Sequence, residues 1–209
     1  MTDAPDPTAA LGRRERKKRA TRRALAEAAQ KLIFERGFDA VTVAEIAEEA
    51  DTAVTTLFKH FPDGKESLIF HGGVELELDG IDIEDRGAAL AAAIRERGDG
   101  ARVLDAIEAF IADRGAFAGQ VRSERFRRQV QLIAQTPTLR AYARRLWMDC
   151  EEPVIAEMAA ATGRHTDDPA LRAVARYALE TPNLFGVDPD ARGALREVFD
   201  RLRAGWPEL

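Results

Sequence analysis

Residues 42–68, TVAEIAEEADTAVTTLFKHFPDGKESL, decide the fold of the N-terminal part of the chain. Thr42 and Glu45 stand three residues apart, which is the pattern of a capping box at the start of a helix. The stretch predicts two short helices, over residues 42–50 and 53–61, because Pro62 and Gly64 end the second one. Asp51 and Thr52 leave room only for a tight turn between them.

The spacing within this stretch favours a helix-turn-helix. Ala47 is the small residue where the first helix lets the second approach closely. Asp51 occupies the turn, where a left-handed residue is usual and Asp is tolerated. Leu57 follows at the offset that points back into the shared core. The same spacing also occurs in unrelated helical proteins, so the pattern needs support from the flanking sequence.

A third helix precedes this pair. Leu25, Ala28, Ala29, Leu32 and Ile33 form one apolar stripe, and we expect the helix to begin near Thr21 and to end at Gly37. Residues 1–20 are predicted to be a disordered, basic N-terminal arm. Within residues 13–23, RRERKKRATRR, eight basic residues face a single acid.

Composition sets the broad class. The 209 residues are 45% hydrophobic and 32% charged, which is typical of a soluble globular protein. No apolar run approaches the roughly 20 residues that span a bilayer, and the N-terminus lacks the apolar centre of a signal peptide. The lone cysteine, Cys150, excludes an intrachain disulfide framework. We therefore expect a cytoplasmic protein with no membrane partner.

The rest of the chain is predicted to be all-α. Apolar residues at helical spacing indicate helices over residues 86–97, 101–114, about 126–135, 139–150, 168–180 and 190–204. Residues 71–86 contain three glycines and many acids, and we expect an irregular connection there. Pro153 is expected to kink or break the helix that precedes it, and Thr181-Pro182 to end another.

Four motifs stand in unbroken order between residues 34 and 68. They are FERGF at 34–38, TVAEIA at 42–47 with Ala50, TLFKHFP at 56–62 and KESL at 65–68. In this order they resemble the DNA-binding domain of the tetracycline-repressor (TetR) family of bacterial transcription regulators, over residues 21–68. The resemblance implies an N-terminal three-helix DNA-binding domain, followed by an all-helical effector-binding and dimerisation domain over residues 69–209.

The segment departs from the family pattern in a few places. Asp51 replaces the usual turn glycine, and Ala53 stands where a Ser or Thr cap is common. We therefore expect Thr52 or Asp51 to cap the recognition helix instead. Phe58 takes a position often held by tyrosine. One residue is added before Lys65.

The third helix of such a domain lies in the major groove, with its N-terminal residues at the base edges. The expected base-facing residues are Thr52, Ala53, Val54 and Thr55, whose hydroxyl and methyl groups suit bases and thymine methyls. Residues expected near the phosphate backbone are Arg22 in the basic run, Thr42, Phe58, Lys59, His60 and Lys65. For Phe58 and His60 a purely structural role is the alternative. For the basic run of residues 13–23 the alternative is a solvated tail that does not contact DNA.

The resemblance further implies a homodimer and a small-molecule effector. The expected dimer interface lies in the last two helices, with Leu171, Val174, Ala178, Leu195, Val198, Phe199 and Leu202. The expected pocket lies in the middle helices, lined by Phe110, Phe117, Gln131, Arg144, Trp147, Cys150 and Met158. Each of these apolar residues also suits an ordinary core.

No pattern indicates catalysis. His60, His71 and His165 are too scattered for a metal site, and no catalytic Ser-His-Asp order, phosphate loop or cofactor motif appears. The chain is therefore predicted to be no enzyme and to need no cofactor. The leading hypothesis is a homodimeric repressor that a small-molecule ligand releases from double-stranded operator DNA. The alternatives are an activator, a regulator without effector, and an α-helical enzyme or small-molecule-binding module.

Overall fold

A computed structural model describes residues 12–71, 86–114, 117, 124–186 and 190–207. The regular elements in these ranges are eleven α-helices, with no strand among them, so the predicted all-α class is confirmed. The chain divides into two compact units, residues 1–74 and 75–209. In these ranges no helix is both long and apolar enough to cross a membrane.

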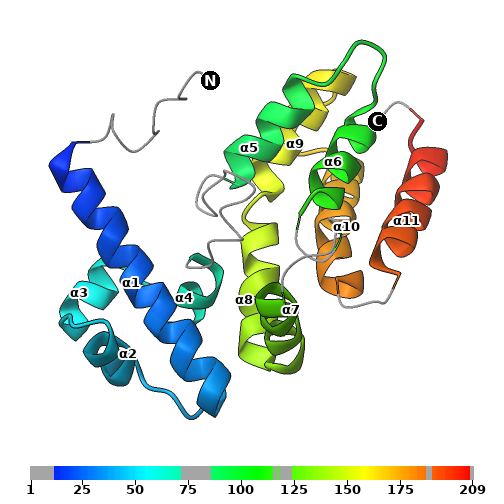
Figure 1. The fold of residues 1–209 in the computed structure, drawn as a ribbon. Coiled ribbons are helices and arrows are strands. Elements are labelled where there is room, and N and C mark those ends of the chain that lie inside the picture. Colours follow the sequence, from blue (N-terminus) through cyan, green and yellow to red (C-terminus); the bar gives the residue numbers. More distant parts are fainter. Residues whose placement is uncertain (1–11, 72–85, 115–116, 118–123, 187–189, 208–209) are drawn as a thin grey trace, which may run out of the picture. The chain divides into compact units, whose positions relative to one another are not determined.

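Unit 1 contains four helices: α1 (Arg13–Arg36), α2 (Val43–Glu49), α3 (Val54–His60) and α4 (Lys65–His71). Helix α1 packs against α2 and α4, and α2 packs against α3 (Figure 1). Their shared core is formed by the buried side chains of Leu25, Ala29, Ile33, Phe38, Val41, Ile46, Ala47, Leu57, Phe61, Leu68 and Ile69.

Helix α1 begins eight residues earlier than expected. Residues 13–20 are helical, so the prediction of a disordered arm is wrong for this part, while residues 1–11 lie outside the described residues. Thr21 does not cap the helix. Its hydroxyl donates to the Lys17 carbonyl at 3.0 Å, one turn back within α1.

The predicted capping box opens α2. The Thr42 hydroxyl accepts from the Glu45 amide at 3.3 Å, and the Glu45 carboxylate accepts from the Thr42 amide at 2.8 Å. The other carboxylate oxygen of Glu45 accepts from Arg36 at the end of α1, also at 2.8 Å. A second ion pair, Lys31 to Glu49 at 2.6 Å, joins the same two helices. The start of α2 is thus held from both sides.

The turn between α2 and α3 has the predicted left-handed residue. Asp51 has φ of 49°, and the Thr52 amide donates to the Ala47 carbonyl at 2.9 Å. The capping prediction is wrong, because α3 begins after Ala53 with no side-chain cap. The backbone of the turn, rather than a side chain at 51 or 52, sets where the recognition helix begins.

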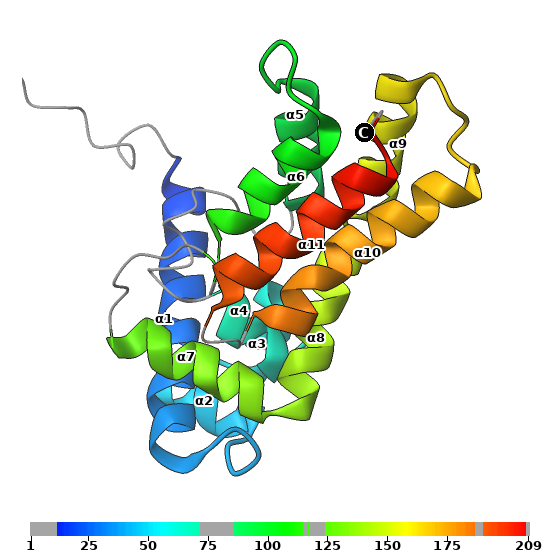
Figure 2. The same ribbon diagram turned by 90° about the vertical axis from the view of Figure 1, so that its right-hand side faces the viewer.

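Unit 2 contains seven helices: α5 (Arg86–Arg95), α6 (Val103–Ala112), α7 (Glu124–Gln135), α8 (Pro137–Met148), α9 (Glu151–Thr162), α10 (Pro169–Phe185) and α11 (Ala191–Gly205). Helix α10 packs against α8, α9 and α11, and α6 packs against α5 and α11. In Figure 2, α10 and α11 run side by side across the unit. One apolar cluster fills the space between these helices, with Leu104, Ile107, Val154, Ile155, Leu179 and Phe199 among its buried members.

Two prolines act differently from expectation. The break between α8 and α9 falls at Asp149 and Cys150, before Pro153. Pro153 lies in the first turn of α9, where a backbone amide hydrogen would have no partner within the helix in any case. Helix α10 does not end at Thr181-Pro182 but continues to Phe185 with Pro182 inside it. Past the proline, the Gly186 amide still donates to the Pro182 carbonyl at 2.9 Å.

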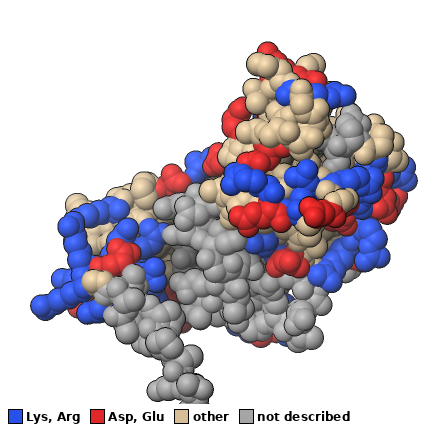
Figure 3. All heavy atoms as spheres, turned by 90° about the horizontal axis from the view of Figure 1, so that it is seen from above, with Lys and Arg blue, Asp and Glu red and all other residues tan. Residues whose placement is uncertain are grey.

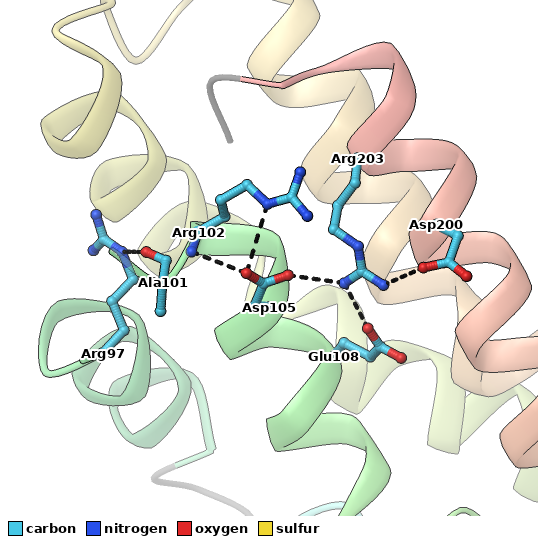
Figure 4. Close-up of polar contacts among 7 residues, drawn as sticks. All are labelled: Arg97, Ala101, Arg102, Asp105, Glu108, Asp200 and Arg203. Carbon is cyan, nitrogen blue, oxygen red and sulfur yellow. Dashed lines mark hydrogen bonds and ion pairs between the residues drawn. The ribbon is translucent and has the colours of Figure 1, made fainter. Parts of the chain in front are cut away.

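A buried arginine links α6 and α11 (Figure 4). The Arg203 side chain is only 12% exposed and donates to Asp105 at 3.0 Å and to Glu108 at 2.6 Å, both on α6. It also donates to Asp200, one turn earlier on α11, at 2.6 Å. Three carboxylates therefore converge on one guanidinium, which fixes the register of the two helices.

Candidate nucleic-acid interface

Helix α3 presents an outward face that mixes apolar and hydroxyl groups. Val54 and Phe58, one turn apart, are 36% and 44% exposed, although large apolar side chains are normally buried. Ala53, Thr55 and Lys59 are exposed as well, and Thr52 is half-buried. This face carries methyl groups, an aromatic ring, a hydroxyl and an ammonium group, which are the groups that contact thymine methyls, bases and phosphates.

The opposite face of α3 is anchored. Leu57 and Phe61 are almost completely buried in the core of unit 1. Arg22 of α1 donates to the His60 carbonyl at 3.0 Å, and its guanidinium lies over the Phe61 ring at 4.8 Å. Arg22, predicted to contact phosphate, therefore also holds the C-terminal end of α3 against α1.

Lys65 has a structural role that the sequence analysis missed. Its ammonium group donates to the carbonyls of Phe38 and Val41, at 2.5 and 2.9 Å, and lies 4.1 Å from the centre of the Phe38 ring. Both carbonyls belong to the connection between α1 and α2. An ammonium group has three hydrogens, so two of them already serve this connection.

Thr42 and His60 also have partners within unit 1. The Thr42 hydroxyl and the Thr42 amide are both used in the capping box with Glu45. The pKa of His60 is lowered by partial burial and then by the nearby charges of Arg22, Lys18 and Lys59. Four cationic or potentially cationic groups therefore gather where α3 ends beside α1, which suits a polyanion.

The residues predicted to line a pocket in unit 2 fall into two groups. Phe110, Phe117, Cys150 and Met158 are buried in the apolar cluster, and Trp147 packs against it. The predicted polar contacts lie outside that cluster. Gln131 is exposed, and the exposed Arg144 donates to Glu180 on α10 at 2.8 Å.

Glu180 is the polar group in this region that sequence reasoning missed. One carboxylate oxygen accepts from Arg144 and from Asn183, both at 2.8 Å. The other, Oε2, is shielded from solvent and has no hydrogen-bond partner among the described residues. Helical periodicity in the sequence identifies buried apolar positions. It does not distinguish a half-buried acid such as Glu180 from an exposed one, so the sequence did not predict this group.

The chemistry of Cys150 is that of a packing residue. The side chain is buried, and this burial raises the pKa of the thiol to about 11. The thiol is therefore protonated at neutral pH, whereas the thiolate is the reactive form. Within the described ranges no group of three or more His, Cys, Asp or Glu residues could hold a metal ion.

The residues predicted for a dimer interface lie mainly in the core of their own chain. Six of them are buried in the apolar cluster, and Val198 packs against it: Leu171, Val174, Ala178, Leu195, Phe199 and Leu202 are the buried six. The same helices present other groups to solvent. Tyr177 and Leu184 on α10, two turns apart, are 50% and 52% exposed. An open groove of about 430 Å³ runs along α11, lined by Gly193, Arg196, Glu197, Asp200, Arg201 and Ala204.

Two protein families match this chain. Residues 25–71 match the family described as "Bacterial regulatory proteins, tetR family". Residues 101–207, about half of the chain, match the family described as "MftR C-terminal domain". The first match runs from the middle of α1 to the end of α4 and so includes the exposed face of α3. The second match covers α6 to α11.

Individual relatives agree with these families. The chain is 31% identical over 101 residues to the "Uncharacterized HTH-type transcriptional regulator YdeS" of Bacillus subtilis (strain 168), over 48% of this chain and 50% of that protein. The chain thus spans about half the length of the curated relative it matches.

Solved structures were compared with the fold of this chain. The structure of SmeT, described as the repressor of the Stenotrophomonas maltophilia multidrug efflux pump SmeDEF, matches with a TM-score of 0.50 and 18% identity, over 90% of this chain and 91% of that one. Salmonella enterica GusR matches with a TM-score of 0.47 and 19% identity, over 88% and 92% of the two chains. At this level of identity the SmeT likeness shows the fold alone.

Proposed function

This chain belongs to the TetR family of bacterial transcription regulators and is a DNA-binding protein, and we propose that it is a homodimeric repressor released from its operator by a small molecule. The observation that carries the proposal is the exposed face of α3. Val54 and Phe58 point outward on a helix whose other face is locked into the core by Leu57 and Phe61. Among the described residues of unit 1 this face is exposed to solvent, and its methyl and hydroxyl groups suit the major groove.

The proposed DNA contacts divide by position on α3. Ala53, Val54 and Thr55, at the N-terminal end, face the bases together with Thr52. Phe58, Lys59 and His60, at the C-terminal end, lie against the sugar-phosphate backbone. Thr42, which is exposed at the start of α2, lies towards the phosphate backbone. Arg22 and Lys65 act mainly by holding α3 and the α1–α2 connection in place, since Arg22 donates to the His60 carbonyl and two of the three hydrogens of the Lys65 ammonium group are used there.

The proposed dimer interface is the outer face of α10 and α11. The exposed Tyr177 and Leu184 supply apolar area on α10, and the groove along α11 gives a complementary hollow. The buried stripe with Leu171 and Phe199 supports this face from beneath. A pair of such faces from two copies would form a four-helix contact, and a symmetric dimer places two α3 helices on one near-palindromic operator.

The proposed effector site is the apolar cluster between α6, α8, α9 and α10. Phe110, Phe117, Trp147 and Met158 supply apolar contacts, and Arg144 lies beside the unpartnered oxygen of Glu180. A shielded carboxylate oxygen without a donor is unfavourable, so a ligand that brings a hydrogen-bond donor would satisfy it. We infer an apolar effector that carries an amine or hydroxyl group. The effector releases the protein from its operator because it binds more tightly to the conformation that does not fit DNA than to the conformation that does.

The test is binding of the purified full-length protein to the DNA upstream of its own gene, in cytoplasm-like salt, against random duplex competitor. A specific regulator retains the upstream duplex at a large excess of competitor. Loss of both duplexes at the same competitor concentration would reject specific regulation. Transcription from that promoter in vitro then separates a repressor, which lowers the transcript, from an activator, which raises it.

A further inference from the structure

The first half of α1 is a helix without a core beneath it. The first fully buried side chain of α1 is Leu25, and residues 13–20 are exposed apart from the half-buried Glu15. At 1.5 Å per residue, residues 13–24 extend α1 by roughly 18 Å before its packed part begins. We call residues 13–20 the basic extension.

The charges of the basic extension oppose its own helix. It holds Arg13, Arg14, Arg16, Lys17, Lys18 and Arg19 against one acid, Glu15, which lies 3.8 Å from Arg19. Cations in the first turns of a helix are repelled by the positive end of its dipole, and like charges four residues apart repel each other. A bound polyanion would reverse both effects. Lys and Arg atoms gather over this end of unit 1 in Figure 3.

One face of the basic extension continues the proposed DNA surface. Arg14, Lys18 and Arg22 follow each other at steps of four residues, so they lie on one side of α1. Arg22 on that side contacts the His60 carbonyl at the end of α3, and the charge of Lys18 acts on His60 as well. The row of cations therefore starts at the C-terminal end of the recognition helix and leads away from it along α1.

We propose that the basic extension binds DNA phosphates as a rigid helix, through Arg14 and Lys18, and so lengthens the contact beyond the part of the operator that α3 covers. This proposal rests on the proposed function, because α3 must lie in the major groove for the row to meet the backbone. It differs from the predicted disordered arm, because residues 13–20 are helical. The helix rises by roughly 6 Å from Lys18 to Arg14, which corresponds to about two base pairs along the DNA.

The charge test compares two double variants with the same loss of charge. Arg14→Gln with Lys18→Gln removes the face that leads to α3, whereas Arg13→Gln with Arg16→Gln removes cations from the other side of the helix. Each phosphate contact contributes about 0.9 to the slope of log affinity against log salt. In the proposed dimer the first variant loses two contacts in each subunit, so it is expected to flatten this slope by about 4, and the second by less than half as much. Equal slopes for the two variants would overturn the proposal, because diffuse attraction does not depend on the face.

The helix test keeps every charge. Ala20→Pro breaks α1 between the extension and the packed part, and the proline then occupies the first turn of the shortened helix, where it is tolerated. A rigid contact predicts that Ala20→Pro flattens the salt slope as much as Arg14→Gln with Lys18→Gln. Unchanged affinity and slope would show that the segment binds as a flexible arm, which contradicts the proposal.

Both tests use the upstream duplex and a random duplex with the full chain. If wild-type protein prefers neither duplex, the proposed function fails. If wild-type protein prefers the upstream duplex while the variants leave the slope unchanged, only the basic extension is excluded. Circular dichroism and the melting temperature verify that each variant retains the packed part of unit 1.

Discussion

Single residues explain how the recognition helix is positioned. Asp51 adopts the left-handed conformation that the sequence predicts for the turn, and Ala47 and Leu57 meet beneath it in the core. These roles could be predicted because they depend on local spacing. The contacts of Lys65 could not, since its carbonyl partners at Phe38 and Val41 lie far back in the sequence and carbonyls belong to every residue.

Lys65 and Lys59 give a matched pair of predictions. Lys65→Met keeps the apolar stem but removes two charge-assisted hydrogen bonds, and it is expected to lower the free energy of unfolding by about 2 kcal/mol. Lys59→Met, at an exposed position, is expected to leave stability within about 0.5 kcal/mol. Because the proposed dimer has two copies of Lys59, the variant is expected to flatten the salt dependence of DNA binding by about 2. Urea unfolding and DNA titrations measure both. A stable Lys65→Met protein with a flattened salt slope would return Lys65 to the role of a phosphate clamp.

Glu45 makes the stability of unit 1 depend on pH. The pKa of its carboxyl is lowered to about 2, first by the backbone hydrogen bond from Thr42, then by the Thr42 hydroxyl and by Arg36. A lowered pKa means that the folded state favours the carboxylate, so this stabilisation is present above about pH 4.5 and is lost as pH falls towards 2.

The variant Glu45→Gln tests this pH dependence. Wild-type protein is expected to be more stable than the variant at pH 7, with a difference that shrinks steadily as pH falls from 5 to 3. Urea unfolding at a series of pH values measures the difference. A difference that stays constant over this range would contradict the role of the ionised capping box.

At the scale of helices, the sequence predicts which segments are helical better than it predicts where each helix begins and ends. Apolar stripes locate the helices that form, because each must bury one face. They do not show where a helix continues without a core, as in residues 13–20, or where a proline is absorbed, as at Pro182. Nor do the stripes show whether an apolar face is buried in the core of its own chain or against a second copy. The face with Leu171 and Val174 turns inward in the chain itself, while Tyr177 on the other side is exposed.

The pairing of α6 with α11 depends on Arg203. Arg203→Met leaves Asp105, Glu108 and Asp200 without their shared cation and is expected to lower the free energy of unfolding by about 2 kcal/mol, since the arginine is largely buried while its partners are partly exposed. Arg127→Met is the control, because this arginine is 63% exposed and its ion pair with Glu124 lies on the surface of α7, where such a pair contributes little to stability. Thermal unfolding of the two variants provides the comparison. Equal losses would mean that the carboxylates are satisfied without Arg203.

The outer face of α10 is expected to hold two copies together. Tyr177→Glu with Leu184→Glu places charges on the proposed contact without altering the buried stripe, so the variant is expected to sediment as a monomer that retains its helix content. Ala160→Glu with Ala161→Glu, at exposed positions on α9, adds the same two charges away from α10 and is expected to leave the dimer intact. A dimeric double variant would place the interface elsewhere.

At the scale of the whole molecule, the two units have different charge. Residues 1–66 carry no net charge but contain the basic run, and the net charge of −5 belongs to the remainder. An acidic unit 2 repels DNA, so attraction is confined to unit 1. The net charge of the whole chain therefore hides the feature that suits it to DNA.

Selection of bound sequences from a randomised duplex library by the full-length protein tests the central claim most directly. A homodimer that reads DNA with α3 is expected to enrich a near-palindrome whose half-sites have centres about 10 base pairs apart, close to one turn of DNA. Recovery of single half-sites would contradict the dimer. Recovery of sequences no different from the starting library would contradict specific reading by α3.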